Sequence, residues 1–102
     1  MASRKSAVIV ASGAVGSNTD TGLLVREQAA QGCAINACAS GDDGDLILFY
    51  VFEDGEELQI STHALADGVL TTINFVYKVN HMKVYYKMDG AGTLRVDVTS
   101  WS

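Results

Sequence analysis

This chain of 102 residues contains no proline, only two cysteines and no long apolar segment. Its turns must therefore be made by glycine, aspartate and asparagine, and four Asp-Gly pairs are present to make them. No apolar run reaches the roughly 18 residues that a membrane-spanning helix needs. The apolar run over residues 6–11 is also too short for the core of a secretory signal peptide. We therefore expect no membrane partner and no secretion by that route.

The two cysteines, Cys33 and Cys38, favour neither a disulfide nor a zinc site. A spacing of five residues points them to opposite faces of a strand. No pair of histidines stands beside them at the spacing of zinc ligands. We expect small, buried thiols, because free cysteine is among the most buried residue types, and we expect no cofactor.

Positive charge is scarce as well, because the chain has seven Lys and Arg but twelve Asp and Glu, which gives a net charge of −5. Seven of the twelve acids fall between Asp42 and Glu57, whereas Arg4 and Lys5 form the only basic pair. Nucleic acids and anionic membranes both reward clustered Lys and Arg. Neither is expected as a partner of this chain.

The segment Asp45–Glu53 is the centre of the predicted fold, because seven consecutive apolar residues lie between two acidic turns. Such a run predicts a central strand that is covered on both faces. By alternation, one face carries Leu46, Leu48, Tyr50 and Phe52, and the other carries Ile47, Phe49 and Val51. Only a second sheet, a helix layer or a neighbouring subunit could cover the second of these faces.

The remaining pattern predicts short strands with turn signals every 8–12 residues, as in an all-β antiparallel β-sandwich or jelly roll of seven or eight strands. We expect one domain over residues 1–102, with residues 1–22 as a flexible or docking N-terminal segment. Ser12–Gly22 is dense in turn formers and is predicted to be a loop. The other strands are predicted at Ser6–Ala11, Leu23–Gln28 (or a short helix), Gly32–Ala39, Glu56–Thr62, Val69–Lys78, Met82–Lys87 and Thr93–Thr99.

Alternation also predicts which side chains of these strands enter the core. The Asp-Gly turn at residues 53–55 favours a hairpin, and it sends the chain back with Leu58 and Ile60 inward. Later in the chain the predicted inward residues are Ile73, Phe75 and Tyr77. Residues 63–68 are expected to connect the two strands.

The acidic turn over residues 42–45 is a candidate calcium site, because carboxylates on a glycine-containing loop supply hard oxygen ligands. Asp67 and Asp89, on other loops, could join it. The turn lacks the ligand spacing of an EF-hand. A solvated turn with no metal is therefore the favoured interpretation.

Catalytic motifs are not apparent. His63 and His81 have no nucleophile at a recognisable position, and neither Ser12 nor Ser61 lies in a G-x-S-x-G elbow. We therefore expect a protein that is not an enzyme.

Carbohydrate binding is the alternative function, because flat aromatic rings can stack on sugar rings. Aromatic residues in the core or at an interface are the favoured interpretation. Alternation assigns Tyr50, Tyr77 and Tyr86 to the core, which leaves Tyr85 and Trp101 as the candidate sugar-binding residues. Calcium from the acidic turn could assist such a module.

Apolar strand surface exceeds what so small a domain can bury within itself. This surplus predicts association with other copies of the chain or with a larger assembly. The candidate interface residues are Val8, Ile9, Val10, Ile47, Phe49 and Val51.

Two stretches carry a resemblance to known proteins: A-S-G-D-D-G-D-L-I-L-F-Y-V-F-E-D-G at 39–55 and H-M-K-V-Y-Y-K-M-D-G-A-G-T-L-R-V-D-V-T-S-W at 81–101. They resemble small β-sandwich proteins of tailed-phage virions, namely capsid decoration or cement proteins and modules of head fibres and tails. The resemblance implies a structural virion protein that is assembled in the host cytoplasm. Its partners would be further copies of itself, as a trimer when it decorates a capsid, and the major capsid protein or another virion component.

Overall fold

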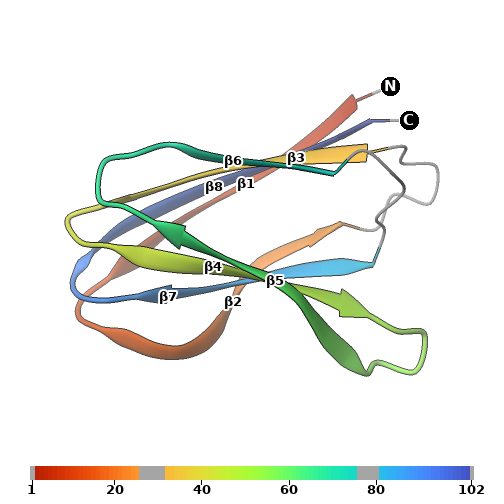
Figure 1. Cartoon of the computed structure of the whole chain (residues 1–102), viewed down its shortest axis with the longest axis horizontal. Helices are drawn as coiled ribbons and strands as arrows, with labels where there is room; N and C mark the ends of the chain where they lie inside the picture. Colours follow the sequence, from red (N-terminus) through yellow and green to blue (C-terminus); the bar gives the residue numbers. More distant parts are fainter. Residues whose placement is uncertain (1, 26–31, 76–80, 102) are drawn as a thin grey trace.

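The protein is an all-β sandwich in a computed structural model that describes residues 2–25, 32–75 and 81–101. Figure 1 shows two sheets packed face to face. The first sheet contains β1 (Ala2–Ala11), β8 (Gly92–Trp101), β3 (Gly32–Ser40) and β6 (Thr71–Phe75), in that order. The second contains β2 (Val15–Val25), β7 (Met82–Met88), β4 (Gly44–Val51) and β5 (Glu57–Leu65).

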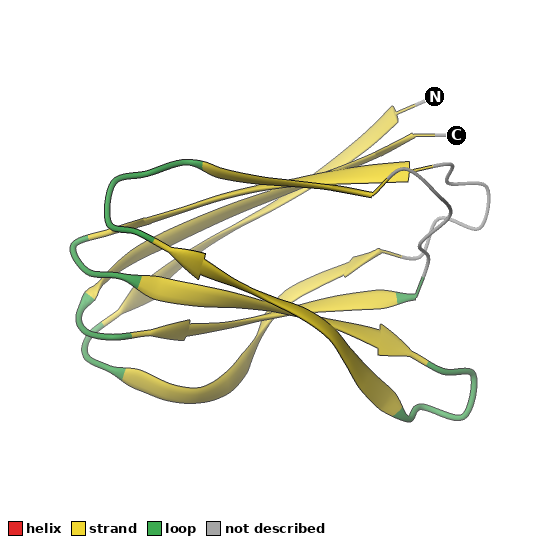
Figure 2. Ribbon diagram, viewed as in Figure 1, coloured by secondary structure: helices red, strands yellow, loops and turns green. Residues whose placement is uncertain are grey.

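All strand pairs within the described residues are antiparallel. The orders 1-8-3-6 and 2-7-4-5 bring strands that are far apart in the chain side by side, as in a double-sheet jelly roll. The predicted fold class is therefore confirmed. Figure 2 shows strands and loops only in the part of the chain that is coloured, and no helix there is long and apolar enough to cross a membrane.

The core lies between the sheets and follows the alternation along the strands. On β7, Met82, Val84, Tyr86 and Met88 are buried, while the residues between them face away from the first sheet. Leu46 and Leu48 of β4 meet them in register across the strand pair, opposite Tyr86 and Val84. The first sheet contributes Cys33, Ile35, Ala37, Ala39, Leu94, Val96 and Val98. The expectation of a buried thiol is met at Cys33, whereas Cys38 is half-buried on the opposite face.

The predicted loop over Ser12–Gly22 is wrong, because β2 begins at Val15 and runs to Val25. This edge strand pairs with β7 through two register shifts, which accommodate turn-forming residues such as Gly22, whose φ is +84°. The Thr21 hydroxyl also donates a hydrogen bond of 2.7 Å to the Val84 carbonyl. Strand β1 starts earlier than predicted and pairs with β8 along residues 2–11, so most of the N-terminal segment 1–22 belongs to the two sheets.

Two further strand predictions are adjusted. Strand β5 extends to Leu65, through part of the predicted connection over residues 63–68. Strand β6 starts at Thr71, and its buried Ile73 confirms one predicted core position. The parts of Leu23–Gln28 after Val25 and of Val69–Lys78 after Phe75 lie outside the described residues, as do the side chain of Phe75 and all of Tyr77.

The close approach of β8 to the loop after β3 generates a stability prediction at Gly92. A Cβ atom at this position would overlap the Ser40 carbonyl oxygen and would lie 3.1 Å from the Met88 methyl carbon. We expect Gly92→Ala to lower the free energy of unfolding by about 1–3 kcal/mol, because the backbone must move to admit the methyl group. Urea denaturation monitored by circular dichroism measures the change.

The matched control is Gly16→Ala on β2, where a Cβ atom would meet nothing within 4 Å. This variant should differ from the parent protein by no more than about 0.5 kcal/mol. Equal effects of the two substitutions would contradict the packing at Gly92.

Candidate functional site

The predicted interface residues lie on different parts of the sandwich. Val8 and Val10 are on the edge strand β1 and face solvent, with exposed fractions of 64% and 78%. Ile9, between them, packs against the core. Ile47, Phe49 and Val51 lie on the outer face of the second sheet, so the structure does not bring the two groups together.

On that outer face, side chains of the same sheet cover much of β4. Ile47 is only 2% exposed, and its neighbours across the sheet are Thr62 on β5 and Tyr85 on β7. Phe49 and Val51 are half-buried, and the Phe49 ring meets the Tyr85 ring edge-on, with centroids 4.9 Å apart. On this outer face, the apolar surface that the central strand exposes is therefore confined to Phe49 and Val51.

Tyr85, a candidate sugar-binding residue, is half-buried and engaged by charged neighbours. Its hydroxyl donates a hydrogen bond to the Glu57 carboxylate, which also lies 3.4 Å from the Lys83 ammonium group. The hydrogen bond to Glu57, burial and the nearby charge of Asp20 raise the pKa of Tyr85 to about 12. The same hydrogen bond, assisted by Lys83, lowers the pKa of Glu57. The side chain of Trp101, the other candidate, lies outside the described residues.

A second apolar surface lies at the β4–β5 hairpin, and sequence reasoning missed it. Leu58 and Ile60, predicted to face inward, are 58% and 47% exposed, and Phe52 is 45% exposed. Tyr50 is half-buried, packs edge-on against Phe52 at 5.0 Å and stands opposite Leu58. We call Tyr50, Phe52, Leu58 and Ile60 the hairpin patch.

The prediction for Leu58 and Ile60 was wrong for two physical reasons. The hairpin projects away from the first sheet, as Figure 1 shows, so an inward direction there does not lead into the core. The register between β4 and β5 also shifts after Leu48, which leaves Ile60 as the extra residue of a bulge. Alternation of side chains reports which way they point but not how far the opposite sheet extends.

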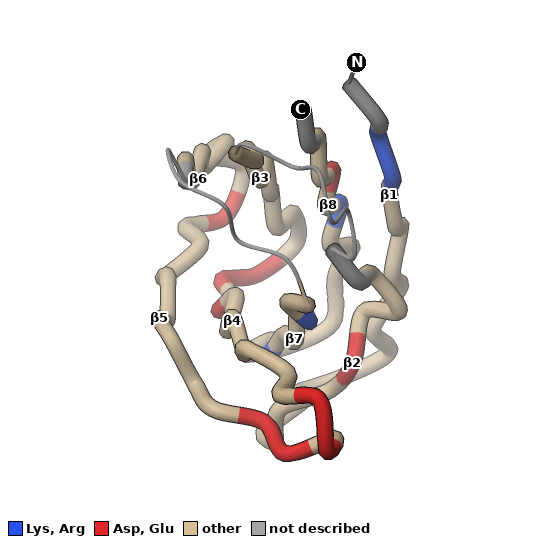
Figure 3. Tube along the Cα trace, turned by 90° about the vertical axis from the view of Figure 1, so that its right-hand side faces the viewer, with Lys and Arg blue, Asp and Glu red and all other residues tan. Residues whose placement is uncertain are grey.

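Acidic residues surround the hairpin patch. Glu53, Asp54 and Glu56 are exposed, and Glu57 follows them at the start of β5. Residues 52–60 contain no Lys or Arg. Figure 3 shows this concentration of acids at the tip of the hairpin.

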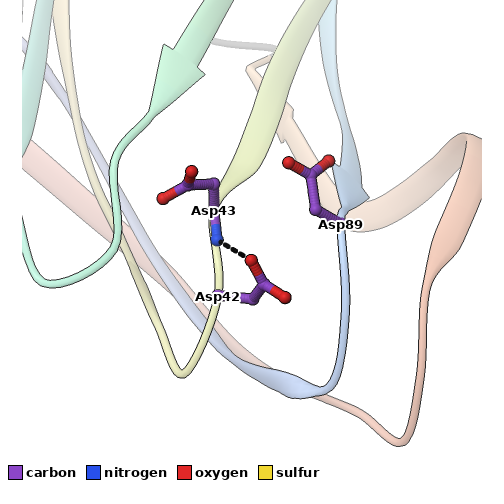
Figure 4. Close-up of side chains that lie close together, drawn as sticks. All are labelled: Asp42, Asp43 and Asp89. Carbon is purple, nitrogen blue, oxygen red and sulfur yellow. Dashed lines mark hydrogen bonds between the residues drawn. The ribbon is translucent and has the colours of Figure 1, made fainter.

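At another loop cluster, the structure brings together three of the acids that were considered for calcium. One carboxylate oxygen each of Asp42, Asp43 and Asp89 lies within 4.8 Å of the others (Figure 4). Asp45 lies on β4 and does not belong to this group, and Asp67 takes part through its backbone, which donates a 2.8 Å hydrogen bond to Asp43 Oδ1. A Cβ atom on Gly90 would overlap Asp42 Oδ2, so this glycine leaves room for the carboxylate.

This acidic cluster already binds neighbouring backbone groups. Asp42 Oδ1 accepts the Asp43 N–H at 2.8 Å, and the Asp67 carboxylate accepts the Gly41 N–H at 3.0 Å. Three carboxylates so close together could also hold a hard cation such as Ca²⁺. Two exposed apolar residues, Val69 and Leu70, follow Asp67 in the same loop.

The histidines show one contact of chemical interest. His63 Nε2 lies 3.0 Å from the Ser61 hydroxyl oxygen, two residues earlier on β5. A serine nucleophile needs an oriented base together with hydrogen-bond donors for the developing oxyanion. A Ser–His contact alone does not supply these donors. That the chain is not an enzyme stays a prediction.

Comparison with known proteins relates this chain to others by fold alone. The sequence matches no protein-family model and no curated protein sequence. Among solved structures, the SPBc2 prophage-derived protein YomS is similar with a TM-score of 0.50 at 14% identity, over 100% of this chain and 96% of that one. A protein of the Bacillus endospore appendages, which form disulfide-linked pili, is similar with a TM-score of 0.51 at 12% identity, over 97% and 87%.

Part of a Clostridium thermocellum xylanase that contains a family 22 carbohydrate-binding module shows a weaker likeness. Its TM-score is 0.46 at 16% identity, and the match covers 95% of this chain and 24% of that one. The two matches with TM-scores of 0.50 and 0.51 show a β-sandwich fold and no particular function.

The Tyr85–Glu57 hydrogen bond predicts a specific alkaline titration. Because the pKa of Tyr85 is raised from 10 to about 12, the bond stabilises the folded protein below pH 10, and this contribution is lost between pH 10 and about 12. Absorbance of ionised tyrosine should show a component near pH 12 that Tyr85→Phe removes. Glu57→Gln should move this component toward pH 10, and a titration unaffected by Glu57→Gln would contradict the contact.

The acidic cluster predicts different effects for two substitutions of Asp43 in buffer that contains EDTA. Asp43→Ala should lower the free energy of unfolding by about 1 kcal/mol, because the Asp67 N–H loses its acceptor. Asp43→Asn keeps an acceptor and reduces repulsion among the carboxylates, so we expect no loss of stability beyond about 0.5 kcal/mol.

Thermal unfolding with added Ca²⁺ separates this structural role from cation binding. If the cluster has only a structural role, added Ca²⁺ leaves the difference in melting temperature between the parent protein and Asp43→Asn unchanged. A rise in melting temperature with Ca²⁺ that Asp43→Asn abolishes would contradict that interpretation.

Proposed function

We propose that this chain is a non-enzymatic structural protein of a phage particle, most specifically a capsid decoration or cement protein. In this role it binds as an oligomer between the subunits of the shell and stabilises them against separation. Its location would be the virion, after assembly in the host cytoplasm. A structural module of a tail or fibre is the related assignment within the same class.

The observation that carries the proposal is apolar surface outside a complete core. Val8 and Val10 on β1 and the hairpin patch are exposed, although the buried side chains between the sheets already form a continuous cluster. Protein interfaces of ordinary size bury about 800 Å² on each partner. Covering both surfaces in an assembly removes them from water and holds neighbouring subunits together.

Two further observations support the assignment to a phage particle. The stretches 39–55 and 81–101 resemble β-sandwich proteins of tailed-phage virions. The fold is similar to that of a prophage-derived protein over the full length of this chain. Jelly rolls also occur widely in viral capsid domains.

Binding to shells tests this proposal directly. The protein should co-sediment with mature shells of the parent phage that have been stripped of it, and it should raise the temperature at which those shells disassemble. Val8→Ser/Val10→Ser should weaken binding at least about tenfold, because about 1.4 kcal/mol of apolar contact is lost.

Asn74→Ala, an exposed position on β6 at the opposite edge of the same sheet, is the matched control and should bind as the parent protein does. Absence of binding to shells would overturn the decoration role. Binding to isolated tails or fibres instead would move the protein to another part of the particle.

Carbohydrate binding is the second candidate, and the outer face of the second sheet supports it. Tyr85 is partly exposed there beside the carboxylates of Glu57 and Asp20, and an aromatic ring with neighbouring hydrogen-bond acceptors is typical of sugar sites. A glycan array would detect binding, and tryptophan fluorescence during sugar titration would report on Trp101. Binding that Tyr85→Ala abolishes would favour this function over the structural one.

A further inference from the structure

Two edge strands lie at opposite sides of the sandwich. Strand β1 ends the first sheet and β5 ends the second. Figure 3, which views the sandwich end-on, shows β5 on the left side and β1 on the right side. An edge strand presents backbone N–H and C=O groups that another strand can pair with.

The chemistry of these two edges is complementary. The β5 edge carries the hairpin patch with Glu53, Asp54 and Glu56, all exposed and of one charge sign. Strand β1 carries exposed Val8 and Val10 after Arg4 and Lys5, and residues 1–19 contain no acid. Arg4 pairs with Asp97, yet its side chain remains 71% exposed, so it is accessible to the acids of another copy.

We propose that the hairpin patch and β5 edge of one copy bind strand β1 of the next copy, head to tail. This inference rests on the proposed structural role and names the surfaces that build the oligomer. Because the two surfaces differ, the contact is heterologous, and repetition of it makes a ring or an open row of copies.

The positions of charge along the strands favour a parallel arrangement. Both β1 and β5 begin at the end of the sandwich where the termini lie and run toward the other end (Figure 1). A parallel alignment that places Arg4 beside Glu56 also places Val8 beside Ile60. An antiparallel alignment with Arg4 beside Glu56 would carry Val8 past the start of β5, into the turn.

Like charge disfavours symmetric contacts between two hairpins. A two-fold contact would bring Glu53, Asp54 and Glu56 of one copy against the same residues of the other, and like charges brought together at an interface cost free energy. Pairing the acidic hairpin with the basic strand avoids this repulsion.

Complementary charge reversal tests the head-to-tail contact on the full chain. One variant carries Arg4→Glu/Lys5→Glu, and the other carries Glu53→Lys/Glu56→Lys. Each alone should associate at least about tenfold more weakly, measured by light scattering coupled to size-exclusion chromatography at low salt. An equimolar mixture should recover association, because the unchanged hairpin of the first variant meets the unchanged strand of the second, and the new lysines of the second meet the new glutamates of the first.

Lys87→Glu, on the outer face of β7 in the middle of the second sheet, is the control and should associate as the parent does. Circular dichroism confirms that each variant is folded. The inference would be overturned if the parent protein stayed monomeric up to about 100 µM, which corresponds to an association free energy no stronger than about −5.5 kcal/mol. It would also be overturned if the charge reversals had no effect on association. Reversals that weaken association without recovery on mixing would also overturn it, because they would indicate a contact other than strand to hairpin.

Failure of this inference is distinguishable from failure of the proposed function. A monomer that still binds and stabilises shells would overturn the head-to-tail contact and leave the decoration role intact. A head-to-tail oligomer that ignores shells would do the reverse.

Discussion

The burial of side chains between two sheets of unequal reach is the constraint on which the rest of the structure depends. Where the sheets overlap, alternation sends Leu46, Leu48, Val84 and Val96 into a shared core, and each is fully buried. Where the β4–β5 hairpin runs beyond the first sheet, the same alternation leaves Leu58 in solvent. One pattern of residues thus produces both the core and an exposed apolar surface.

The exposed apolar residues of the described chain lie on the edge strand β1, on the β4–β5 hairpin and in the loop before β6, and not at the centre of either sheet. The outer face of the second sheet protects Ile47 with Phe49 and Tyr85, and the latter is held by Glu57. On the outer face of the first sheet, the Thr72 hydroxyl donates a 2.6 Å hydrogen bond to the Asn36 side chain. Most of the exposed apolar residues are on β1 and on the hairpin, where backbone groups are also open to pairing, and Val69 and Leu70 are exposed in the loop before β6.

How much could be predicted from the sequence depended on how regular each strand is. Strands β3, β7 and β8 alternate without interruption, and their predicted ranges agree with the structure to within a residue or two. The sequence predicts a loop up to Gly22 and a strand only from Leu23, because the first part of β2 is rich in glycine and polar residues that are typical of turns. An edge strand accommodates such residues through bulges. The sequence points to the acidic turn at residues 42–45, with Asp67 and Asp89 as further candidates, whereas the structure groups Asp42, Asp43 and Asp89. The selection of these three, the position of Asp67 and the overhang of the hairpin depend on long-range packing that no local pattern reports.

Hydrogen–deuterium exchange at two protein concentrations tests the central claim, that the open edges of this sandwich serve association, most directly. If the account holds, backbone amides of β1 and of the β5 edge exchange more slowly at high concentration, while those of the central strands β8 and β4 are unchanged. Exchange in β1 and β5 that is the same at both concentrations would contradict it.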